Sequence, residues 1–271
     1  MANFLVAPPS CPPQDGFRLG ILECDTPLEK AQQKYKGYGA IFESLLRASS
    51  SSPPPPPSST ASPELQVTIW NVQGDQAAYP DLSSVDGLLI TGSSKKPPGT
   101  AGHDAWAETP WIVRLVSFVQ QALLATRVRV IGVCFGHQII GRALRAPVGR
   151  NDSWETGVVE FPLTRSGRHV FGQNKLTLHQ MHQDVVFQCP PGVKLLGSTD
   201  VCPIQGMFVP RKLLTLQGHP EVNAEIMTEV VDSRYNRGVF TEEQWVKARE
   251  EVQRPHDGFI VGRAFYRFLL K

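Results

Sequence analysis

Residues 128–138, VRVIGVCFGHQ, decide the fold of this 271-residue chain. An apolar run rich in β-branched residues ends in Gly132-Val133-Cys134-Phe135-Gly136, and a helix-compatible segment, HQIIGRAL, follows at once. This order of strand, sharp turn and helix predicts a nucleophile elbow, with cysteine in the position that serine takes in the hydrolase version of the turn. The turn would present the Cys134 thiol at a helix N-terminus, which favours the reactive thiolate.

The segments before the elbow alternate between strand and helix patterns. We expect strands at 17–25, 65–72, 86–92 and 128–134, and helices at 28–47 and around 110–125. The strands are continuously apolar, which is typical of strands buried on both faces. The sequence therefore predicts an α/β fold with a mostly parallel central sheet and helices on both faces.

The second half of the chain has a different rhythm. Short strand patterns at 155–163, 175–182, 193–199, 203–209 and 212–217 predict a small antiparallel layer added to the same domain, and helical patterns follow at 222–236, 241–253 and 257–270. We expect one domain over 17–271, preceded by a flexible tail at 1–16. Residues 49–63, SSSSPPPPPSSTASP, form a disordered Pro/Ser-rich insert in this prediction, and 237–271 form a helical extension.

Composition excludes several classes of function. The net charge is +2, and no basic stripe interleaved with aromatic residues indicates a nucleic-acid partner. No apolar run approaches the ~18 residues of a membrane span. The five cysteines are scattered without a C-x-x-C pair, which disfavours disulfide frameworks and zinc ribbons. Since no secretory signal is visible either, we expect a cytoplasmic protein without a cofactor.

A cysteine nucleophile needs a base, and a further group that orients the base. Gly218-His219-Pro220-Glu221 directly follows a strand pattern, and Glu221 can reach the His219 imidazole if the chain turns at Pro220. We therefore predict Cys134, His219 and Glu221 as the catalytic residues. His137 is a rival base, but it lies on the same helix as Cys134, so we expect it to pack instead.

Two backbone N–H groups should stabilise the oxyanion that forms when the thiolate attacks a carbonyl. One is the amide of Phe135, at the start of the elbow helix. The other is expected from Gly92 or Ser93, because the loop TGSS ends the strand at 86–92 and the carboxyl ends of parallel strands share one edge of the sheet. We expect the Gly- and Pro-rich segment 93–105 beside it to act as a mobile lid.

Metal binding is disfavoured at His179, His182 and Asp184. Alternation along a strand places residue 179 on the face opposite to residue 182. The two imidazoles would then point away from each other, and we predict no metal ion.

The elbow GVCFGHQ together with GHPE resembles the class I (triad) glutamine amidotransferase family. Supporting matches are the loop ITGS at 90–93, WETGV at 154–158 and HQDVV at 182–186. The resemblance covers roughly residues 17–235, and it is strongest to stand-alone fungal amidotransferase-like proteins and plant γ-glutamyl peptidases. It implies a flavodoxin-like fold. The loop GSSKKPP departs from the family's common GGP, which leaves the second oxyanion donor open between Gly92 and Ser93.

The resemblance implies a hydrolase that cleaves a γ-glutamyl amide bond through a γ-glutamyl thioester on Cys134. It implies substrate contacts at Gln138, His182, Gln183 and Trp154. The implied partners are a small-molecule γ-glutamyl substrate and a separate ammonia-using synthetase chain. Two alternatives stay open: a γ-glutamyl peptidase acting on glutathione or its conjugates, and a non-catalytic binding or regulatory protein on the same fold.

Overall fold

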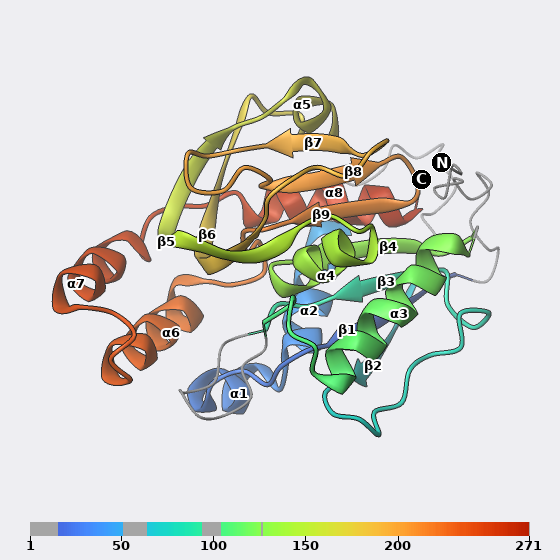
Figure 1. Ribbon diagram of the computed structural model, residues 1–271, viewed down its shortest axis with the longest axis horizontal. Helices are drawn as coiled ribbons and strands as arrows, with labels where there is room; N and C mark the ends of the chain where they lie inside the picture. The colour runs from blue at the N-terminus through green and yellow to red at the C-terminus, as the bar shows by residue number, and fades with distance from the viewer. Residues whose placement is uncertain (1–15, 51–63, 94–103, 126, 271) are drawn as a thin grey trace.

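The computed structural model describes residues 16–50, 64–93, 104–125 and 127–270. Three segments predicted from the sequence therefore lie outside the described residues, except for their edges. They are the tail at 1–16, the Pro/Ser-rich insert at 49–63 and the lid at 93–105. The strand-helix alternation expected before residue 143 is present, and the chain folds around a central sheet with helices on both faces (Figure 1).

The central sheet has seven strands in the order β2-β1-β3-β4-β9-β8-β7. Strands β2, β1, β3, β4 and β9 are parallel, whereas β8 and β7 continue the sheet in antiparallel pairing. The first five strands follow the flavodoxin order, in which ligands bind at the carboxyl ends of the strands. The strands are β1 (Phe17–Glu23), β2 (Leu65–Asn71), β3 (Gly87–Ile90), β4 (Arg129–Val133), β7 (Lys194–Gly197), β8 (Gly206–Val209) and β9 (Leu213–Leu216).

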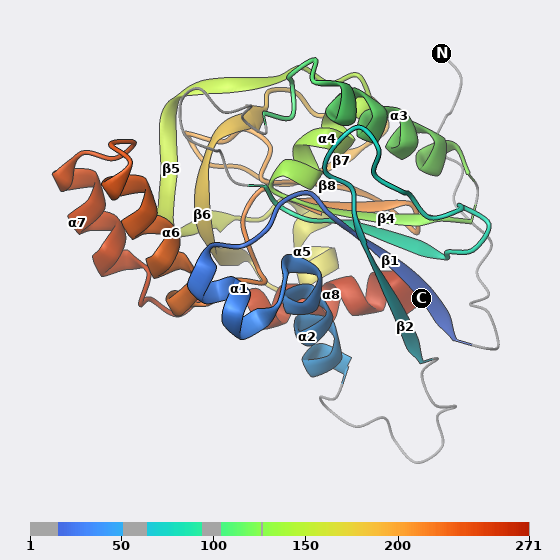
Figure 2. The same ribbon diagram turned by 90° about the horizontal axis from the view of Figure 1, so that it is seen from below.

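Helices bury the two faces of the sheet in separate apolar clusters (Figure 2). On one face lie α3 (Pro110–Leu124) and α4 (Phe135–Ala143). On the other lie α2 (Tyr38–Ser50), α8 (Gly258–Leu270) and the short α5 (Arg165–Phe171). Phe42 of α2 and Phe265 of α8 are completely buried together, so the C-terminal helix is part of the core rather than an appendage.

Beyond the carboxyl ends of the strands, β5 (Val148–Pro162) and β6 (Lys175–Val186) pair as a separate antiparallel hairpin. Helices α6 (Ala224–Asn236) and α7 (Glu242–Glu251) lie beside this hairpin (Figure 1). The expectation that all five short strands would form the added layer was wrong, because only β5 and β6 do. β9 is buried along its whole length and pairs with β4, and β7 and β8 extend the main sheet from it.

The helix expected at 28–47 is two helices, α1 (Glu29–Tyr35) and α2. The break lies at Lys36, which has a left-handed backbone with φ 72°, and at Gly37, beside the Glu23 carboxylate. Glu23 accepts a hydrogen bond from the amide of Gly39 at 2.7 Å, at the start of α2. No helix of the described residues is long and apolar enough to span a membrane.

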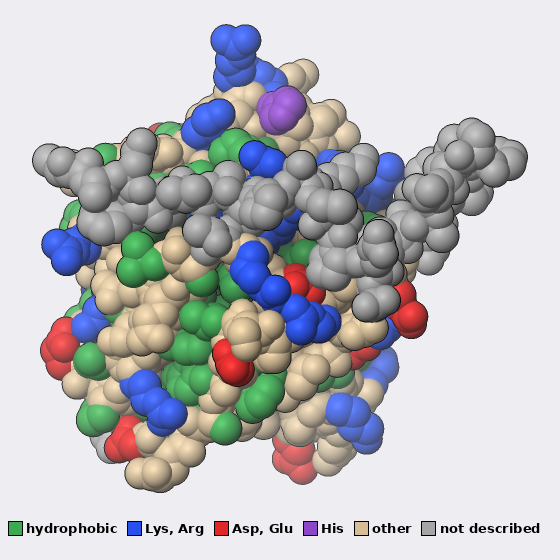
Figure 3. All heavy atoms as spheres, turned by 90° about the vertical axis from the view of Figure 1, so that its right-hand side faces the viewer, with side chains coloured by type: hydrophobic (Ala, Val, Ile, Leu, Met, Phe, Trp, Pro, Cys, Tyr) green, Lys and Arg blue, Asp and Glu red, His purple; other side chains and the backbone are tan. Residues whose placement is uncertain are grey.

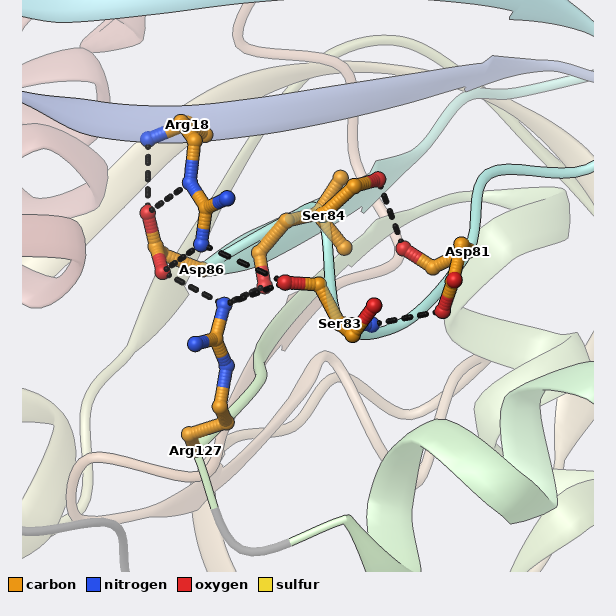
Figure 4. Close-up of polar contacts among 7 residues, drawn as sticks. Arg18, Asp81, Ser83, Ser84, Asp86 and Arg127 are labelled. Atoms are coloured by element: carbon orange, nitrogen blue, oxygen red, sulfur yellow. Dashed lines mark hydrogen bonds and ion pairs between the residues drawn. The ribbon is translucent and has the colours of Figure 1, made fainter.

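An ion cluster joins the amino-terminal ends of the parallel strands (Figure 4). Asp86, just before β3, accepts hydrogen bonds from the amide and Nε of Arg18 on β1, both at 3.0 Å, and pairs with Arg127 at 2.8 Å. Burial alone would raise the pKa of the Asp86 carboxyl, but the hydrogen bonds from Arg18 and the charges of Arg18 and Arg127 lower it below its usual value. The cluster therefore stabilises the fold while Asp86 is ionised.

On the right-hand side of the molecule as seen in Figure 1, the visible basic side chains of the described residues are scattered. Figure 3 shows that face, where Lys and Arg side chains are interspersed with acidic, polar and hydrophobic ones.

We expect Asp86→Asn to lower the free energy of unfolding at pH 7 by about 1–3 kcal/mol, the range for removing one member of a buried charged hydrogen bond. Because the folded-state pKa of Asp86 is lowered, its contribution is present above the unfolded value of about 3.9 and is lost as the pH falls below it. Urea titrations between pH 3 and pH 7 measure both effects.

The control is Glu43→Gln, which removes a helix-surface pair with Arg47 and should change stability little. Equal losses in the two variants, or an unchanged pH dependence in Asp86→Asn, would contradict the structural role of the cluster.

Candidate active site

Cys134 occupies the tight turn between β4 and α4, as expected for a nucleophile elbow. Its backbone has φ 52° and ψ −106°, a region that non-glycine residues rarely adopt. The Cys134 amide donates to the Leu216 carbonyl of β9 at 2.9 Å, which holds the turn against the neighbouring strand. A Cβ at Gly136 would collide with the Ile90 carbonyl of β3, so glycine is required for the close approach of α4 to the sheet.

His219 and Glu221 follow β9 and meet Cys134 at the same edge of the sheet. The Glu221 Oε1 carboxylate oxygen accepts a hydrogen bond from Nδ1 of His219 at 2.7 Å, and the His219 side chain also hydrogen-bonds with Cys134. The Glu221 side chain has no exposed surface, whereas that of His219 is 12% exposed. The three residues predicted to act together are therefore brought into one hydrogen-bonded chain.

The charges within this hydrogen-bonded triad favour the protonated form of His219. Burial alone would lower the pKa of the His219 imidazole, but the Glu221 carboxylate and the Cys134 sulfur raise it well above 6.5. An imidazolium beside the sulfur stabilises the thiolate. The rival base, His137, is fully buried and hydrogen-bonds through Nδ1 to Thr215 at 2.7 Å, and burial lowers its pKa to about 3.

The expected oxyanion donors surround the hydrogen-bonded triad; they are Gly92, Ser93 and Phe135. A Cβ at Gly92 would come within 2.8 Å of His219 Cε1 and 3.7 Å of Cys134 Cβ, so the loop passes directly beside both side chains. Phe135 is the first residue of α4, where a helix leaves its backbone N–H groups without intrahelical partners.

A pocket that is partly open to solvent begins at Cys134. All four residues expected to contact substrate line it, namely Gln138, His182, Gln183 and Trp154, together with Ser93, Phe135 and Asp184. Gln138 also donates to the Asp184 carbonyl at 2.7 Å and to Gln217 Oε1 at 3.1 Å. Gln138 therefore also ties α4 to the pocket wall formed by β6.

His179 and His182 diverge, as strand alternation predicts. His182 donates from Nε2 to Glu155 at 2.8 Å, whereas the His179 ring packs on His256 with a centroid separation of 4.6 Å. The side-chain polar atoms of Glu155, His182 and Cys202 all lie within 4.8 Å of one another.

In this second Cys-His-Glu group the Glu155 carboxylate is the centre of a buried hydrogen-bond network. Thr199 and Gln205 each donate to Glu155 at 2.6 Å, in addition to His182. Burial, reinforced by Glu155, raises the pKa of the fully buried Cys202 thiol, which makes it a poor nucleophile and a poor metal ligand. We assign the group to holding β5, β6 and the 199–205 loop together.

A second pocket opens on the His219 side of the site. Its wall is mainly apolar, with Met181, Val222, Ile226, Met227 and Val230, and it also contains Tyr38, Gly92, Ser93 and Arg234. Sequence reasoning missed Arg234, which lines both pockets and lies 5.6 Å from the centre of the Trp154 ring. A signal was present, because Arg234 continues the apolar stripe 226, 227, 230 and 231 of α6, where a charged residue is unusual.

We expect iodoacetamide at pH 7 to alkylate Cys134 before Cys24 and Cys202. Cys24 and Cys202 are completely buried, and burial raises the pKa of each thiol. The experiment uses a Cys11→Ser background, because residue 11 lies outside the described residues, and peptide mass spectrometry follows each site. Labelling of Cys24 or Cys202 at the rate of Cys134 would contradict the assigned reactivity.

Comparison with known proteins agrees with this geometry. The family model for glutamine amidotransferase class-I matches residues 59–234. The chain is 32% identical over 260 residues to a glutamine amidotransferase-like protein of Schizosaccharomyces pombe, covering 94% of this chain and 99% of that protein. It is 31% identical over 199 residues to gamma-glutamyl peptidase 3 of Arabidopsis thaliana, covering 70% and 76% of the two chains.

The fold is also shared with solved structures. A glutamine amidotransferase of Thermotoga maritima superposes with a TM-score of 0.69 at 15% identity, covering 94% of this chain and 99% of that one. The family model spans more than half of the chain, and the yeast relative matches almost end to end. This chain therefore belongs to the class I glutamine amidotransferase family.

Proposed function

We propose that this protein hydrolyses γ-glutamyl amide bonds, with Cys134 as nucleophile, His219 as general base and acid, and Glu221 as the group that orients His219. The observation that carries the proposal is the hydrogen-bonded chain from Cys134 through His219 to Glu221 at the mouth of two pockets. Cysteine, histidine and carboxylate in this order constitute an acyl-transfer site.

The reaction would proceed in two halves. The Cys134 thiolate attacks the γ-carbonyl carbon, and the resulting oxyanion accepts hydrogen bonds from the amides of Phe135 and of Gly92 or Ser93. When the tetrahedral intermediate collapses, the C–N bond breaks and the leaving amine takes the proton from His219. His219 then removes a proton from water, which attacks the thioester and releases glutamate and Cys134.

The pocket beside Cys134 suits the γ-glutamyl part of the substrate. Its polar lining from Gln138, Gln183 and Asp184 offers hydrogen-bond partners for the α-amino and α-carboxylate groups of glutamate. Trp154 and His182 complete its wall. We assign this pocket to the acyl group.

The apolar pocket favours a second, more specific candidate, a γ-glutamyl peptidase. His219 must protonate the leaving amine, so the leaving group lies on the His219 side of the site, where this pocket opens. Ammonia would use none of the surface of Met181, Ile226 and Met227. An amine with an apolar substituent would bury that substituent in this pocket, and the gain in free energy would be about 25 cal/mol per Å² of apolar surface. The pocket thus supports glutathione conjugates or similar γ-glutamyl compounds over glutamine.

The assay that tests the proposal compares glutamate release from glutamine, glutathione and a glutathione S-conjugate. We expect the greatest kcat/KM for the conjugate, and loss of turnover in Cys134→Ala with an unchanged circular dichroism spectrum. Preference for glutamine would reject the peptidase candidate and favour a separate ammonia-using partner. Release from none of the three, by a folded protein, would reject the enzyme and support a binding protein on the same fold.

Gly92→Ala is expected to lower kcat by about 10- to 100-fold, the usual consequence of displacing a catalytic group by several tenths of an ångström. The new methyl group would lie 2.8 Å from His219 Cε1, so the imidazole must move. Gly149→Ala is the matched control, because its methyl group would meet only Phe187, at 3.4 Å. A Gly92→Ala enzyme with the parent kcat would show that the loop does not constrain His219.

Arg234→Met should raise KM for the glutathione S-conjugate by roughly tenfold or more, the loss expected for one charge-assisted hydrogen bond. Arg234 is a buried cation between the two pockets, and it interacts electrostatically with Cys134 and Asp25. The control Arg237→Met removes an exposed arginine one turn further along the chain. Equal KM values for parent and Arg234→Met would remove Arg234 from substrate recognition.

A further inference from the structure

We propose that Arg234 selects the leaving group: its guanidinium binds a carboxylate carried by the amine that departs on the His219 side of the site. The substrates would then be γ-glutamyl derivatives of apolar amino acids or short peptides, and hydrolysis would release glutamate and the free amino acid or peptide. The inference rests on the proposed function, because it names the substrate class of the same site.

The second pocket combines an apolar wall with positive charge. Its apolar lining is Met181, Val222, Ile226, Met227 and Val230, and its cationic lining is Arg234 and the protonated form of His219. None of the described residues that line this pocket is acidic. A leaving group that is complementary to this wall therefore has both an apolar part and a negative charge.

One face of α6 presents both kinds of side chain. Ile226, Val230 and Arg234 are spaced four residues apart, so they lie in a row along the helix. All three line the second pocket, with the cation at the C-terminal end of the row. In an α-amino acid, the carbon next to the amine carries the side chain and the carboxylate. Such a leaving group could place its side chain against Ile226 and Val230 and its carboxylate at Arg234.

The Arg234 guanidinium is a buried charge that its surroundings compensate only in part. The residue is 6% exposed. Burial, and to a smaller extent Arg237, lowers the pKa of the guanidinium, and the groups that raise it without reversing this shift are Tyr38, Cys134 and Asp25. A buried cation is stabilised by an anion that accepts its hydrogen bonds, and a carboxylate can accept two parallel bonds from a guanidinium. A ligand carboxylate would therefore add negative charge where it is needed.

The structure around Arg234 holds it in place before any ligand binds. Its carbonyl oxygen accepts the amides of Val239 at 2.9 Å and Phe240 at 3.4 Å, at the C-terminal end of α6. Glu229 ties the same helix to α1, because it accepts two backbone amides of the first turn of α1, both at 2.9 Å. The guanidinium carbon lies 5.6 Å from the centre of the Trp154 ring. A group fixed in this way loses little conformational entropy on binding.

The γ-glutamyl half of the substrate has a carboxylate of its own, and Arg234 also borders the pocket beside Cys134. That pocket offers the side-chain amide of Gln183 as another donor. In the second pocket the other cation is His219, which is engaged by the other two residues of the triad. For this reason the leaving-group carboxylate, rather than the glutamyl carboxylate, is placed at Arg234.

The test measures dissociation constants by calorimetry on Cys134→Ala protein, so that binding is read without turnover. γ-Glutamyl-L-leucine is compared with γ-glutamyl-3-methylbutylamide, which has the same apolar group but no carboxylate on the leaving amine. We expect the leucine compound to bind about tenfold more tightly or better, the effect of one charge-assisted hydrogen bond. Adding Arg234→Met should abolish this preference. Adding Arg237→Met, which removes an exposed arginine, should leave it unchanged.

Equal binding of the two compounds by Cys134→Ala protein would overturn the inference, as would a preference that survives Arg234→Met. A third compound, 4-aminobutanoyl-L-leucine, lacks only the glutamyl carboxylate. If Arg234→Met abolishes the discrimination against this third compound and keeps the preference for leucine, Arg234 binds the glutamyl half and the inference is wrong.

If Arg234→Met fails to fold, Arg234→Lys decides. It keeps the positive charge but loses the planar fork of donors, so it should weaken the preference for the leucine compound. An undiminished preference would count against Arg234 as the carboxylate-binding group. The expected preference in a protein that releases no glutamate would refute the proposed reaction while leaving the selection by Arg234 intact.

Discussion

The backbone of Cys134 is the constraint on which the rest of the site depends. Its φ of 52° and ψ of −106° cost of the order of 1–3 kcal/mol for a residue with a side chain. The turn persists because β4 is fully buried, because the Cys134 amide bonds to Leu216, and because Gly136 lets α4 approach Ile90. The strained turn places the sulfur at the start of α4 and at the mouth of a pocket.

The parallel arrangement of β3, β4 and β9 brings the other residues of the proposed reaction centre next to this strained turn. In the observed register Ile90 pairs with Gly132, and Val133 pairs with Leu216. The loops after these strands therefore begin at the same level, and they carry Gly92, Cys134 and His219. The site is enclosed from the other side by the β5–β6 hairpin, α6 and the segment before α8, so both ends of the domain contribute to it.

The elements that are strongly periodic and close to the elbow could be predicted from the sequence. The strand-turn-helix at 128–143 and the proximity of His219 to Glu221 followed from local pattern and spacing, and the four residues expected to contact substrate do line one pocket. The prediction that β9 belongs to the antiparallel layer was wrong, because a four-residue apolar strand has the same sequence pattern in a parallel sheet and in an antiparallel layer. Its pairing with β4 depends on contacts far apart in the sequence.

The place of Arg234 could be predicted only in part, because a charged residue in the apolar stripe of α6 is unusual but does not show which site it lines. Arg234 lies in no motif with its neighbours, and it lines both pockets only because of where α6 packs. The break at Lys36 was hidden as well, since Gly37 beside it packs against Glu23 of β1, which is distant in the sequence.

The most direct test of the central claim is to find the acyl group on Cys134. The protein is mixed with the glutathione S-conjugate, quenched in acid during turnover, digested and analysed by mass spectrometry. The account predicts a γ-glutamyl adduct on the peptide that contains Cys134, which appears within the first turnover and disappears as substrate is exhausted. Turnover without an adduct, or an adduct on another residue, would contradict it.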